Sequence, residues 1–373
     1  MGSDLRLAYE PSAVPHPGET VGEYLEHNGW SQRDLARRTG LTPKTISEIC
    51  AGKAPITPAT SLAFEKVFGR PAHFWLNLQR KFDEVEARRR SANKSHEWWS
   101  WAERFPLEEM QRYGWLEIAD GVSRIDVLLS FLGVSSPNSW DSVWQASKVA
   151  YRQTRKFRTS VEAVSAWVRA ADLMAAELNV MQFDEKRLRS CLGSLREQTR
   201  KKPDDFIPSV QSICASAGIA MVWVPQLSHT GISGCARWPT EKKALIALTL
   251  RYGTDDQVWF TFFHEVAHIL LHRKRHEFIL DNAVEDLADR VVDPEMQSEE
   301  EEANRFAADT LIPPDALSVF VKQNEFTNES IKQFADNLSI GPGILVGRLQ
   351  REGLLKHFQG NKLKQRFHWR IAH

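Results

Sequence analysis

One stretch of eleven residues, FFHEVAHILLH at positions 262–272, restricts the possible folds of this chain more than any other. It places His264 and His268 four residues apart, and on a helix such residues lie on the same face. The residues around them are apolar: Phe262, Phe263, Val266, Ala267, Ile269, Leu270 and Leu271. A helix with these flanks is buried in a core, so the fold must enclose a helix that presents two imidazoles side by side.

The spacing of these side chains is that of the H-E-x-x-H pattern, in which both imidazoles bind one metal ion. Glu265 then lies beside a metal-bound water and can take its proton. We expect His264 and His268 as metal ligands and Glu265 as the catalytic base. Zn²⁺ is the preferred ion, although Mn²⁺ and Fe²⁺ also suit imidazole and carboxylate ligands. The alternative is a core helix with hydrogen-bonded histidines.

A catalytic zinc site needs a third protein ligand, and four consecutive glutamates at 299–302 supply candidates. They begin a predicted helix over 299–314, whose apolar face we assign to Ala303, Phe306, Ala307 and Thr310. Glu302 lies at the edge of that face, one turn before Phe306, so we expect Glu302 to be the ligand, with Glu299 as the next candidate. His272 rotates away from the metal face and is either a supporting group or a plain surface imidazole.

The N-terminal region has the layout of a helix-turn-helix. SQRDLARRTG and LTPKTISEICAGK are two short amphipathic runs with Gly40 at the turn between them. The second helix presents its N-terminal, outward-facing residues to a DNA major groove, and basic residues around it contact phosphate. The expected DNA-binding residues are Gln32, Arg33, Arg37, Thr42, Pro43, Lys44, Thr45, Ser47 and Lys53. The alternative is a helical interaction module that does not bind DNA.

Two regions resemble known families. The run W-S-Q-x-x-L-A-x-x-T-G-L-x-x-x-T-I-S, Trp30 to Ser47, and FGRPAHFWLNLQ, 68–79, resemble the Cro/C1-type (XRE) repressors and their HigA-type antitoxin branch. The H-E-x-x-H motif, E-A-N-x-F-A-x-x-x-L-x-P at 302–313, ISGCARW and GPGILVGRLQ resemble the ImmA/IrrE metallopeptidases. The second resemblance implies a zincin-like domain in which His264, His268 and Glu302 bind zinc and Glu265 is the general base.

These patterns predict a multidomain, mainly α protein in three parts. Residues 1–95 form the helix-turn-helix bundle, 96–200 a helical tryptophan-rich middle region, and 201–373 an α+β zincin-like domain with a helical tail. Strands are expected at 219–225, 232–238 and 243–250, where short β-branched apolar runs end at Gly, Pro or Ser. Four widely spaced cysteines indicate free thiols in a reducing cytoplasm, and no apolar run is long enough to span a membrane.

Charge adds one constraint, since 48 Lys+Arg balance 48 Asp+Glu and any DNA contact must come from a local patch. Taken together, the two resemblances imply a cytoplasmic DNA-binding transcriptional regulator whose zinc peptidase domain cleaves a repressor, a toxin partner or the chain itself. Its partners would be a double-stranded operator, a protein or peptide substrate, and a second copy in a homodimer. The alternative is a HigA-like antitoxin or repressor whose zincin-like domain is a non-catalytic sensor or scaffold.

Overall fold

The computed structural model describes residues 14–119, 122–152, 160–272, 279–281 and 294–369. The chain divides into two compact units, residues 1–99 and 100–373. This division differs from the three parts expected from the sequence, because the tryptophan-rich region belongs to the same unit as residues 201–373. The reason is long-range packing, in which a helix of the middle region covers the sheet of the C-terminal region.

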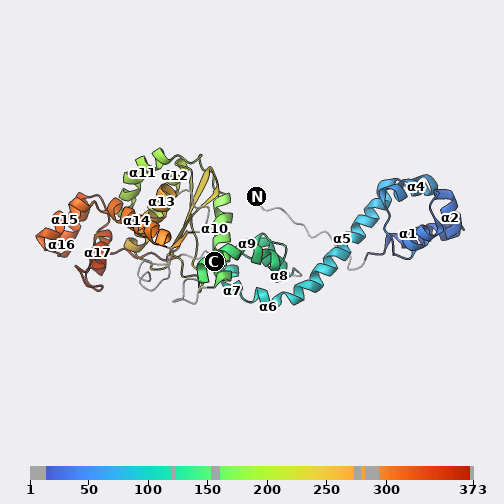
Figure 1. Cartoon of the computed structure of the whole chain (residues 1–373), viewed down its shortest axis with the longest axis horizontal. Helices are drawn as coiled ribbons and strands as arrows, with labels where there is room; N and C mark the ends of the chain where they lie inside the picture. The colour runs from blue at the N-terminus through green and yellow to red at the C-terminus, as the bar shows by residue number, and fades with distance from the viewer. Residues whose placement is uncertain (1–13, 120–121, 153–159, 273–278, 282–293, 370–373) are drawn as a thin grey trace. The chain divides into compact units, whose positions relative to one another are not determined.

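The first unit is a bundle of five helices (Figure 1). They are α1 (Pro17–His27), α2 (Gln32–Thr39), α3 (Pro43–Cys50), α4 (Pro58–Phe68) and α5 (Ala72–Glu97). Ser31, Thr42 and Thr57 cap the starts of α2, α3 and α4, because each accepts a hydrogen bond from a backbone N–H of the first turn. Gly40 and Gly69 adopt left-handed conformations that end α2 and α4.

The first half of α5 is part of this bundle. Trp75 is fully buried among the core residues Val21, Leu25, Leu35, Ala36, Ile46, Ile49, Ile56 and Phe64. Gln79 accepts a hydrogen bond from the backbone N–H of Ile56, and Phe82 contacts the ring of His16 edge-on. Close packing of α1 on α3 depends on Gly18, since a Cβ there would lie 1.9 Å from the carbonyl oxygen of Ile49.

The second unit begins with a helical part. Its helices are α6 (Trp99–Ala102), α7 (Leu107–Arg112), α8 (Arg124–Leu132), α9 (Pro137–Arg152), α10 (Val161–Ala176), α11 (Glu185–Glu197), the short 3-10 helix η1 (Gln198–Arg200) and α12 (Pro203–Ser216). Trp101, Trp140 and Trp167 are buried, and the first two form an aromatic cluster with Phe105. An ion pair between Arg104, in the segment between α6 and α7, and the buried Glu162 of α10 joins these helices.

A four-stranded sheet forms the centre of the second unit, in the order β1-β3-β2-β4. Its strands are β1 (Ile219–Trp223), β2 (Gly234–Thr240), β3 (Lys243–Leu248) and β4 (Ile279–Asp281). β1 pairs with β3 in parallel, and β2 pairs with β3 and β4 antiparallel. The three expected strands are present, and their ends lie within about two residues of the predicted bounds. β4 has no counterpart among the predictions.

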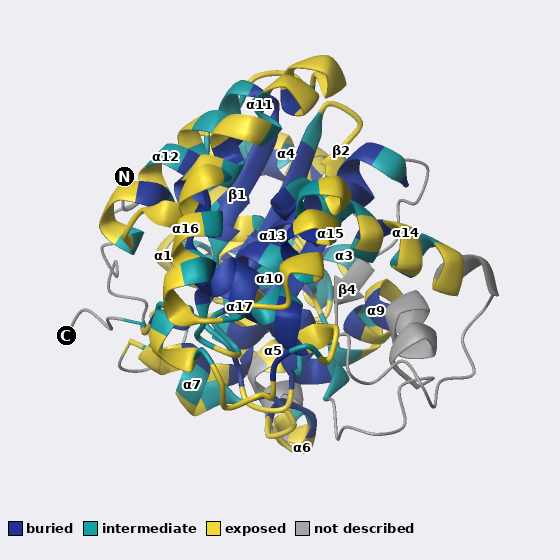
Figure 2. Cartoon of the chain, turned by 90° about the vertical axis from the view of Figure 1, so that its left-hand side faces the viewer, coloured by how far each residue is buried: buried dark blue, intermediate teal, exposed yellow. Residues whose placement is uncertain are grey.

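Helices cover both faces of this sheet. α13 (Asp255–Leu271) lies against β2 and β3 on one side, and α10 lies against β1 and β3 on the other (Figure 1). The remaining elements are α14 (Pro294–Leu311), α15 (Pro314–Gln323), α16 (Asn328–Asn337), α17 (Pro342–Arg351) and the 3-10 helix η3 (Asn361–Leu363). The sheet and α13 form the most deeply buried part of this unit (Figure 2). Among the described helices, none combines the length and apolar character that crossing a bilayer requires.

Candidate metal centre and helix-turn-helix

The motif helix α13 is buried over nearly its whole length. Trp259, Phe262, Phe263, Val266 and Ile269 join the hydrophobic core of the second unit, as their periodicity predicts. His264, Glu265 and His268 are buried in the same helix. Because burying polar or charged side chains is costly unless they are hydrogen-bonded or bind a metal ion, three such residues on one apolar helix indicate a functional site.

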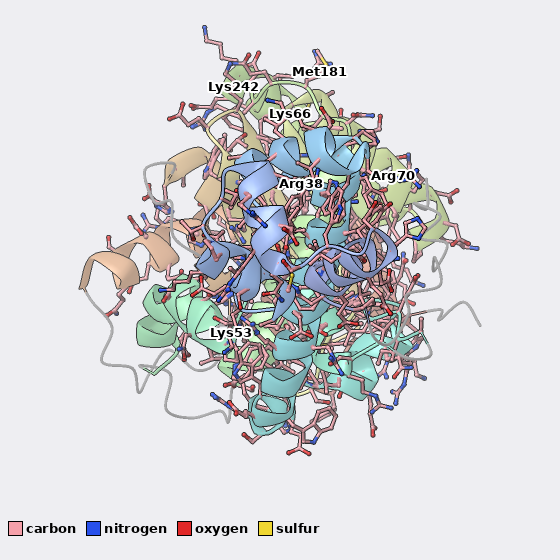
Figure 3. The ribbon with its side chains drawn as sticks, turned by 90° about the vertical axis from the view of Figure 1, so that its right-hand side faces the viewer. Arg38, Lys53, Lys66, Arg70, Met181 and Lys242 are labelled. Atoms are coloured by element: carbon pink, nitrogen blue, oxygen red, sulfur yellow. The ribbon has the colours of Figure 1, made fainter. Side chains whose placement is uncertain are left out.

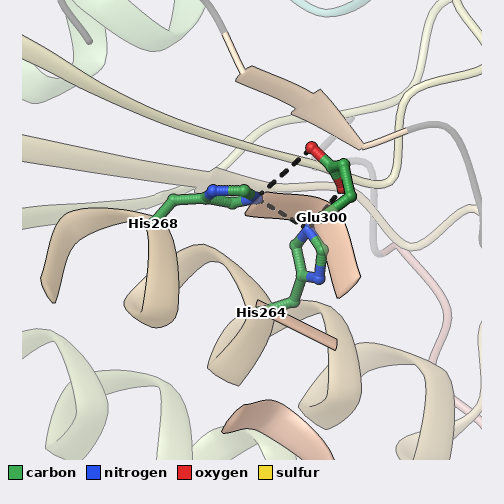
Figure 4. A group of neighbouring side chains, drawn as sticks. All are labelled: His264, His268 and Glu300. Atoms are coloured by element: carbon green, nitrogen blue, oxygen red, sulfur yellow. Dashed lines mark hydrogen bonds and ion pairs between the residues drawn. The ribbon is translucent and has the colours of Figure 1, made fainter. Parts of the chain in front are cut away.

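Three side chains converge at this site: His264, His268 and Glu300 (Figure 4). The Nε2 atoms of the two histidines are 2.9 Å apart. Glu300 comes from α14, and its carboxylate oxygens lie 3.3 Å from His264 Nε2 and 3.6 Å from His268 Nε2. Two imidazoles and one carboxylate are a donor set that zinc accepts in catalytic sites.

The surrounding hydrogen bonds suit a cation between these atoms. Asn304 Oδ1 lies 3.0 Å from His264 Nδ1 and accepts a hydrogen bond from the Nδ1–H tautomer. His268 Nδ1 lies 3.0 Å from His272 Nδ1, and His272 Nε2 lies 3.1 Å from Glu302 Oε2. With the outer nitrogens as donors, both Nε2 atoms point lone pairs at the same space, which is the arrangement in which histidine binds a metal. The residues therefore fit a metal ion.

The third carboxylate differs from the expectation. Glu302 does not join the two histidines; its side chain is 57% exposed and contacts His272. Glu300 occupies the ligand position that was expected of Glu302, and its side chain is only 21% exposed. The reason is the choice of helix face, because the buried residues of α14 are Ala303, Ala307 and Leu311 rather than Phe306 and Thr310.

Glu300 was among the candidate glutamates but was not the one preferred, and Asn304 was not predicted from the sequence. Both lie on the buried stripe of α14, since Glu300 is three residues before Ala303 and Asn304 is four after Glu300. That spacing was the available signal. His272, for which two interpretations were open, is buried and connects His268 to Glu302, so it is a supporting group of the site.

Glu265 lies on the side of α13 that faces the sheet. It is fully buried, and a Cβ at Gly234 of β2 would lie 2.6 Å from its Oε1. Glycine at this position therefore provides the room that the Glu265 carboxylate occupies. Burial and the nearby Glu265 carboxylate raise the pKa of Cys235, the next residue of β2. All four cysteines are free thiols, as expected.

In the first unit, α2 and α3 form the helix-turn-helix. The apolar sides of these amphipathic helices are buried at Leu35, Ala36, Ile46 and Ile49. Of the expected DNA-binding residues, all but Thr45 are exposed: Gln32, Arg33, Arg37, Thr42, Pro43, Lys44, Ser47 and Lys53. Thr45 is half-buried, and its hydroxyl lies 2.8 Å from that of Thr42 at the start of α3.

Local interactions order the side chains around α2. Hydrogen bonds from Ser31, followed by the Arg37 guanidinium, lower the pKa of Asp34 to about 2. Arg38 stacks over the ring of Trp30, with Cζ 4.0 Å from the ring centre. Arg38 and Lys53, both exposed, are labelled in Figure 3. This unit therefore presents a set of mostly basic side chains around the exposed start of α3.

Comparison with known proteins matches both ends of the chain. A helix-turn-helix family model matches residues 21–75, and a model described as IrrE N-terminal-like domain matches residues 243–349. The uncharacterized HTH-type transcriptional regulator YddM of Escherichia coli (strain K12) is 36% identical over 73 residues, which are 20% of this chain and 78% of that protein. Virulence-associated protein I of Dichelobacter nodosus is 39% identical over 69 residues, or 18% of this chain and 64% of that protein.

Solved structures match the same N-terminal segment. An addiction module antidote protein of the HigA family from Coxiella burnetii is 33% identical and covers 22% of this chain and 92% of its own, with a TM-score of 0.21. The Pseudomonas aeruginosa antitoxin HigA, solved with the higBA promoter, is 25% identical and covers 22% of this chain and 90% of its own, with a TM-score of 0.22.

Proposed function

Since this chain belongs to the helix-turn-helix transcriptional regulators through its N-terminal unit and carries an IrrE N-terminal-like domain, we propose that it is a DNA-binding regulator with a zinc-dependent peptidase site. The observation that carries the peptidase part is the convergence of His264, His268 and Glu300 on the buried helix that also holds Glu265. The substrate is a peptide bond in a repressor, in a toxin partner or in the chain itself.

DNA binding is assigned to the exposed residues at the start of α3 and to the basic residues around it. Thr42, Pro43, Lys44 and Ser47 face outward there, where a recognition helix meets base edges. Gln32, Arg33, Arg37 and Lys53 are exposed around it and suit phosphate contacts, as does the Lys44 ammonium group. Regulators of this kind bind two-fold sites, so we propose a homodimer on a double-stranded operator.

The DNA assignment is tested with Arg37→Ala combined with Lys44→Ala. The matched control removes the same charge from α4 and α5 with Lys66→Ala and Lys81→Ala, both exposed. Binding is measured against a labelled duplex selected from random-sequence DNA, over a range of salt concentrations. Loss of two phosphate contacts lowers the slope of log affinity against log salt by about 2. An unchanged slope in the first pair removes both residues from the interface.

At the metal centre each residue has a separate task. His264, His268 and Glu300 hold the metal, while Asn304 and His272 orient the imidazoles. A bound zinc ion supplies Lewis acidity and lowers the pKa of its water toward 7. Glu265 accepts the proton from water and passes it to the leaving amine. The apolar wall of α13 keeps bulk water away from this transfer.

Glu265→Gln tests this assignment, with Glu301→Gln on the exposed side of α14 as control. Each purified full-length protein is loaded with zinc and incubated with a mixture of fluorogenic peptides, and the chain itself is followed by mass spectrometry. Glu265→Gln retains zinc and loses hydrolysis by about 10²–10⁴-fold, the usual contribution of a general base. A wild-type rate in Glu265→Gln contradicts its role. Zinc binding without any hydrolysis in the wild type favours the alternative of a sensor or scaffold.

A further inference from the structure

Thr249 follows β3 directly and is almost completely buried, with 4% of its surface exposed. Its backbone N–H donates to the carbonyl oxygen of Ser233 at 2.9 Å, which continues the pairing of β2 with β3 by one step. Its hydroxyl donates to the carbonyl oxygen of Ile232 at 3.0 Å and accepts a hydrogen bond of 3.2 Å from the N–H of Arg251. The hydroxyl of Thr249 therefore connects the segment after β3 to the segment before β2.

Three consecutive carbonyl groups before β2 are held by this segment. Arg251 adds the third contact, because its Nη1 donates to the carbonyl oxygen of Gly231. Ile232 and Ser233 are buried, so water does not readily replace a lost donor there, and a buried carbonyl group without a partner is costly. These hydrogen bonds therefore fix the backbone of residues 231–233 against the end of β3.

The next residue along the chain is Gly234, which lies against Glu265. A Cβ at Gly234 would lie 2.6 Å from Glu265 Oε1 and 2.7 Å from the Cγ2 atom of Thr261, one turn earlier on α13. The backbone of Gly234 thus limits where the buried Glu265 carboxylate can lie. Because a misplacement of about 1 Å can cost about 10²-fold in rate, the position of this backbone matters for a reaction at Glu265.

We propose that Thr249 is a positioning residue for Glu265. Its hydroxyl holds residues 231–233 on the end of β3 and thereby keeps Gly234 against the carboxylate. This inference rests on the proposed function, in which Glu265 is the general base. The metal-binding side chains come from α13 and α14, so Thr249 affects proton transfer and leaves zinc affinity unchanged.

The test compares Thr249→Val with the matched control Thr230→Val in the full-length protein. Valine has nearly the shape of threonine and lacks its hydroxyl. Thr230 is fully buried in the loop before β2, and its hydroxyl donates to the carbonyl oxygen of Leu227 at 2.8 Å. Each variant loses one buried hydroxyl-to-carbonyl hydrogen bond, but only Thr249→Val loses the link between the two segments. Circular dichroism verifies that both variants keep the wild-type fold.

Peptide hydrolysis by the zinc-loaded proteins gives the first readout. Thr249→Val should lower kcat by about tenfold with zinc affinity unchanged, whereas Thr230→Val should keep the wild-type rate. Thr249→Ser retains the hydroxyl and should restore most of the rate. In a Glu265→Gln background, Thr249→Val should cause no further loss, because residues that act as a unit are not additive. The same tenfold loss in that background overturns the proposal, since Thr249 then acts through another group.

Hydrogen exchange of backbone amides gives a second readout that needs no substrate. Peptides spanning residues 231–236 should exchange faster in Thr249→Val than in the wild type or in Thr230→Val, because a hydrogen bond that holds this segment is lost. Unchanged exchange in Thr249→Val overturns the proposal, even if hydrolysis falls. Absence of hydrolysis in the zinc-loaded wild type refutes the proposed function instead, and the exchange rates then decide alone whether Thr249 fixes this segment.

Discussion

Replacing Glu300 by glutamine tests the metal centre most directly, because Glu302 provides a neighbouring control of the same type. The Glu300 carboxylate lies within 3.6 Å of both His Nε2 atoms, and its side chain is largely shielded from water. The control substitution Glu302→Gln, by contrast, alters only an exposed contact with His272 at 3.1 Å. The two substitutions remove the same charge from the same helix, two residues apart.

The expected losses differ by more than tenfold in affinity. Substituting a residue that only orients a metal ligand costs about 10–100-fold in metal affinity. Loss of a direct ligand should cost at least as much as the upper end of that range. Glu300→Gln is therefore expected to weaken zinc binding by about 100-fold or more, which corresponds to about 2.8 kcal/mol. Exposed charge pairs contribute about 0–1 kcal/mol, so Glu302→Gln should change affinity by about fivefold at most.

The assay is a competition titration of each full-length protein against a zinc-binding dye, at one pH and ionic strength. Circular dichroism verifies that both variants retain the wild-type helical content. If Glu302→Gln weakens zinc binding as much as Glu300→Gln, or more, the assignment of Glu300 is refuted. If neither changes the affinity, zinc binds elsewhere on the chain.

Three other substitutions test the packing around these sites. Gly234→Ala places a methyl group against Glu265. With Glu265 in its proposed role, this should lower hydrolysis by about tenfold or more with zinc retained. Gly193→Ala, which has open space around it, should leave hydrolysis unchanged, and peptide assays with metal analysis measure both variants. Gly18→Ala should lower the melting temperature of the first unit, whereas Gly22→Ala on the same helix should stabilise it by about 0.5–1 kcal/mol. Burial raises the pKa of Asp255 to about 7 from 3.8, so the wild type loses unfolding free energy as pH rises from about 4 to about 7, by up to about 4 kcal/mol. Urea titrations at about pH 4 and about pH 7 measure the free energy of unfolding, and Asp255→Asn should lack this loss. The same pH dependence in both proteins would contradict the raised pKa of Asp255.

The sequence predicts well what depends on neighbouring residues. Ser31, Thr42 and Gly40 determine the ends of α2 and the start of α3 through hydrogen bonds and backbone conformation within a few residues. The same holds for His264 and His268, whose convergence follows from helical periodicity alone.

The third carboxylate depended on a contact between two helices, which no local pattern contains. The predicted face of α14 was only partly right. Ala303 and Ala307 are fully buried, because they allow α14 to approach α13 closely, whereas Phe306 and Thr310 are only half-buried. The buried face is therefore centred on the alanines, and it includes Glu300 rather than Glu302.

The unit boundary was missed for a related reason. Arg237 of β2 pairs with Asp172 of α10 at 2.9 Å, and Lys243 of β3 donates to the carbonyl oxygens at the end of α10. These contacts join residues 65 to 68 positions apart. A change in composition near residue 200 marks a change of secondary structure, and the core continues across it.

The extent of α5 determines where the chain can be shortened. Trp75, Gln79 and Phe82 all belong to the packing of the first unit, so a truncation before Phe82 removes part of its core. A chain ending between residues 84 and 99 keeps each of these contacts. Within that interval a single proteolytic cut would release the helix-turn-helix with its core complete, and the severed fragment would keep its fold while losing its covalent link to the metal centre.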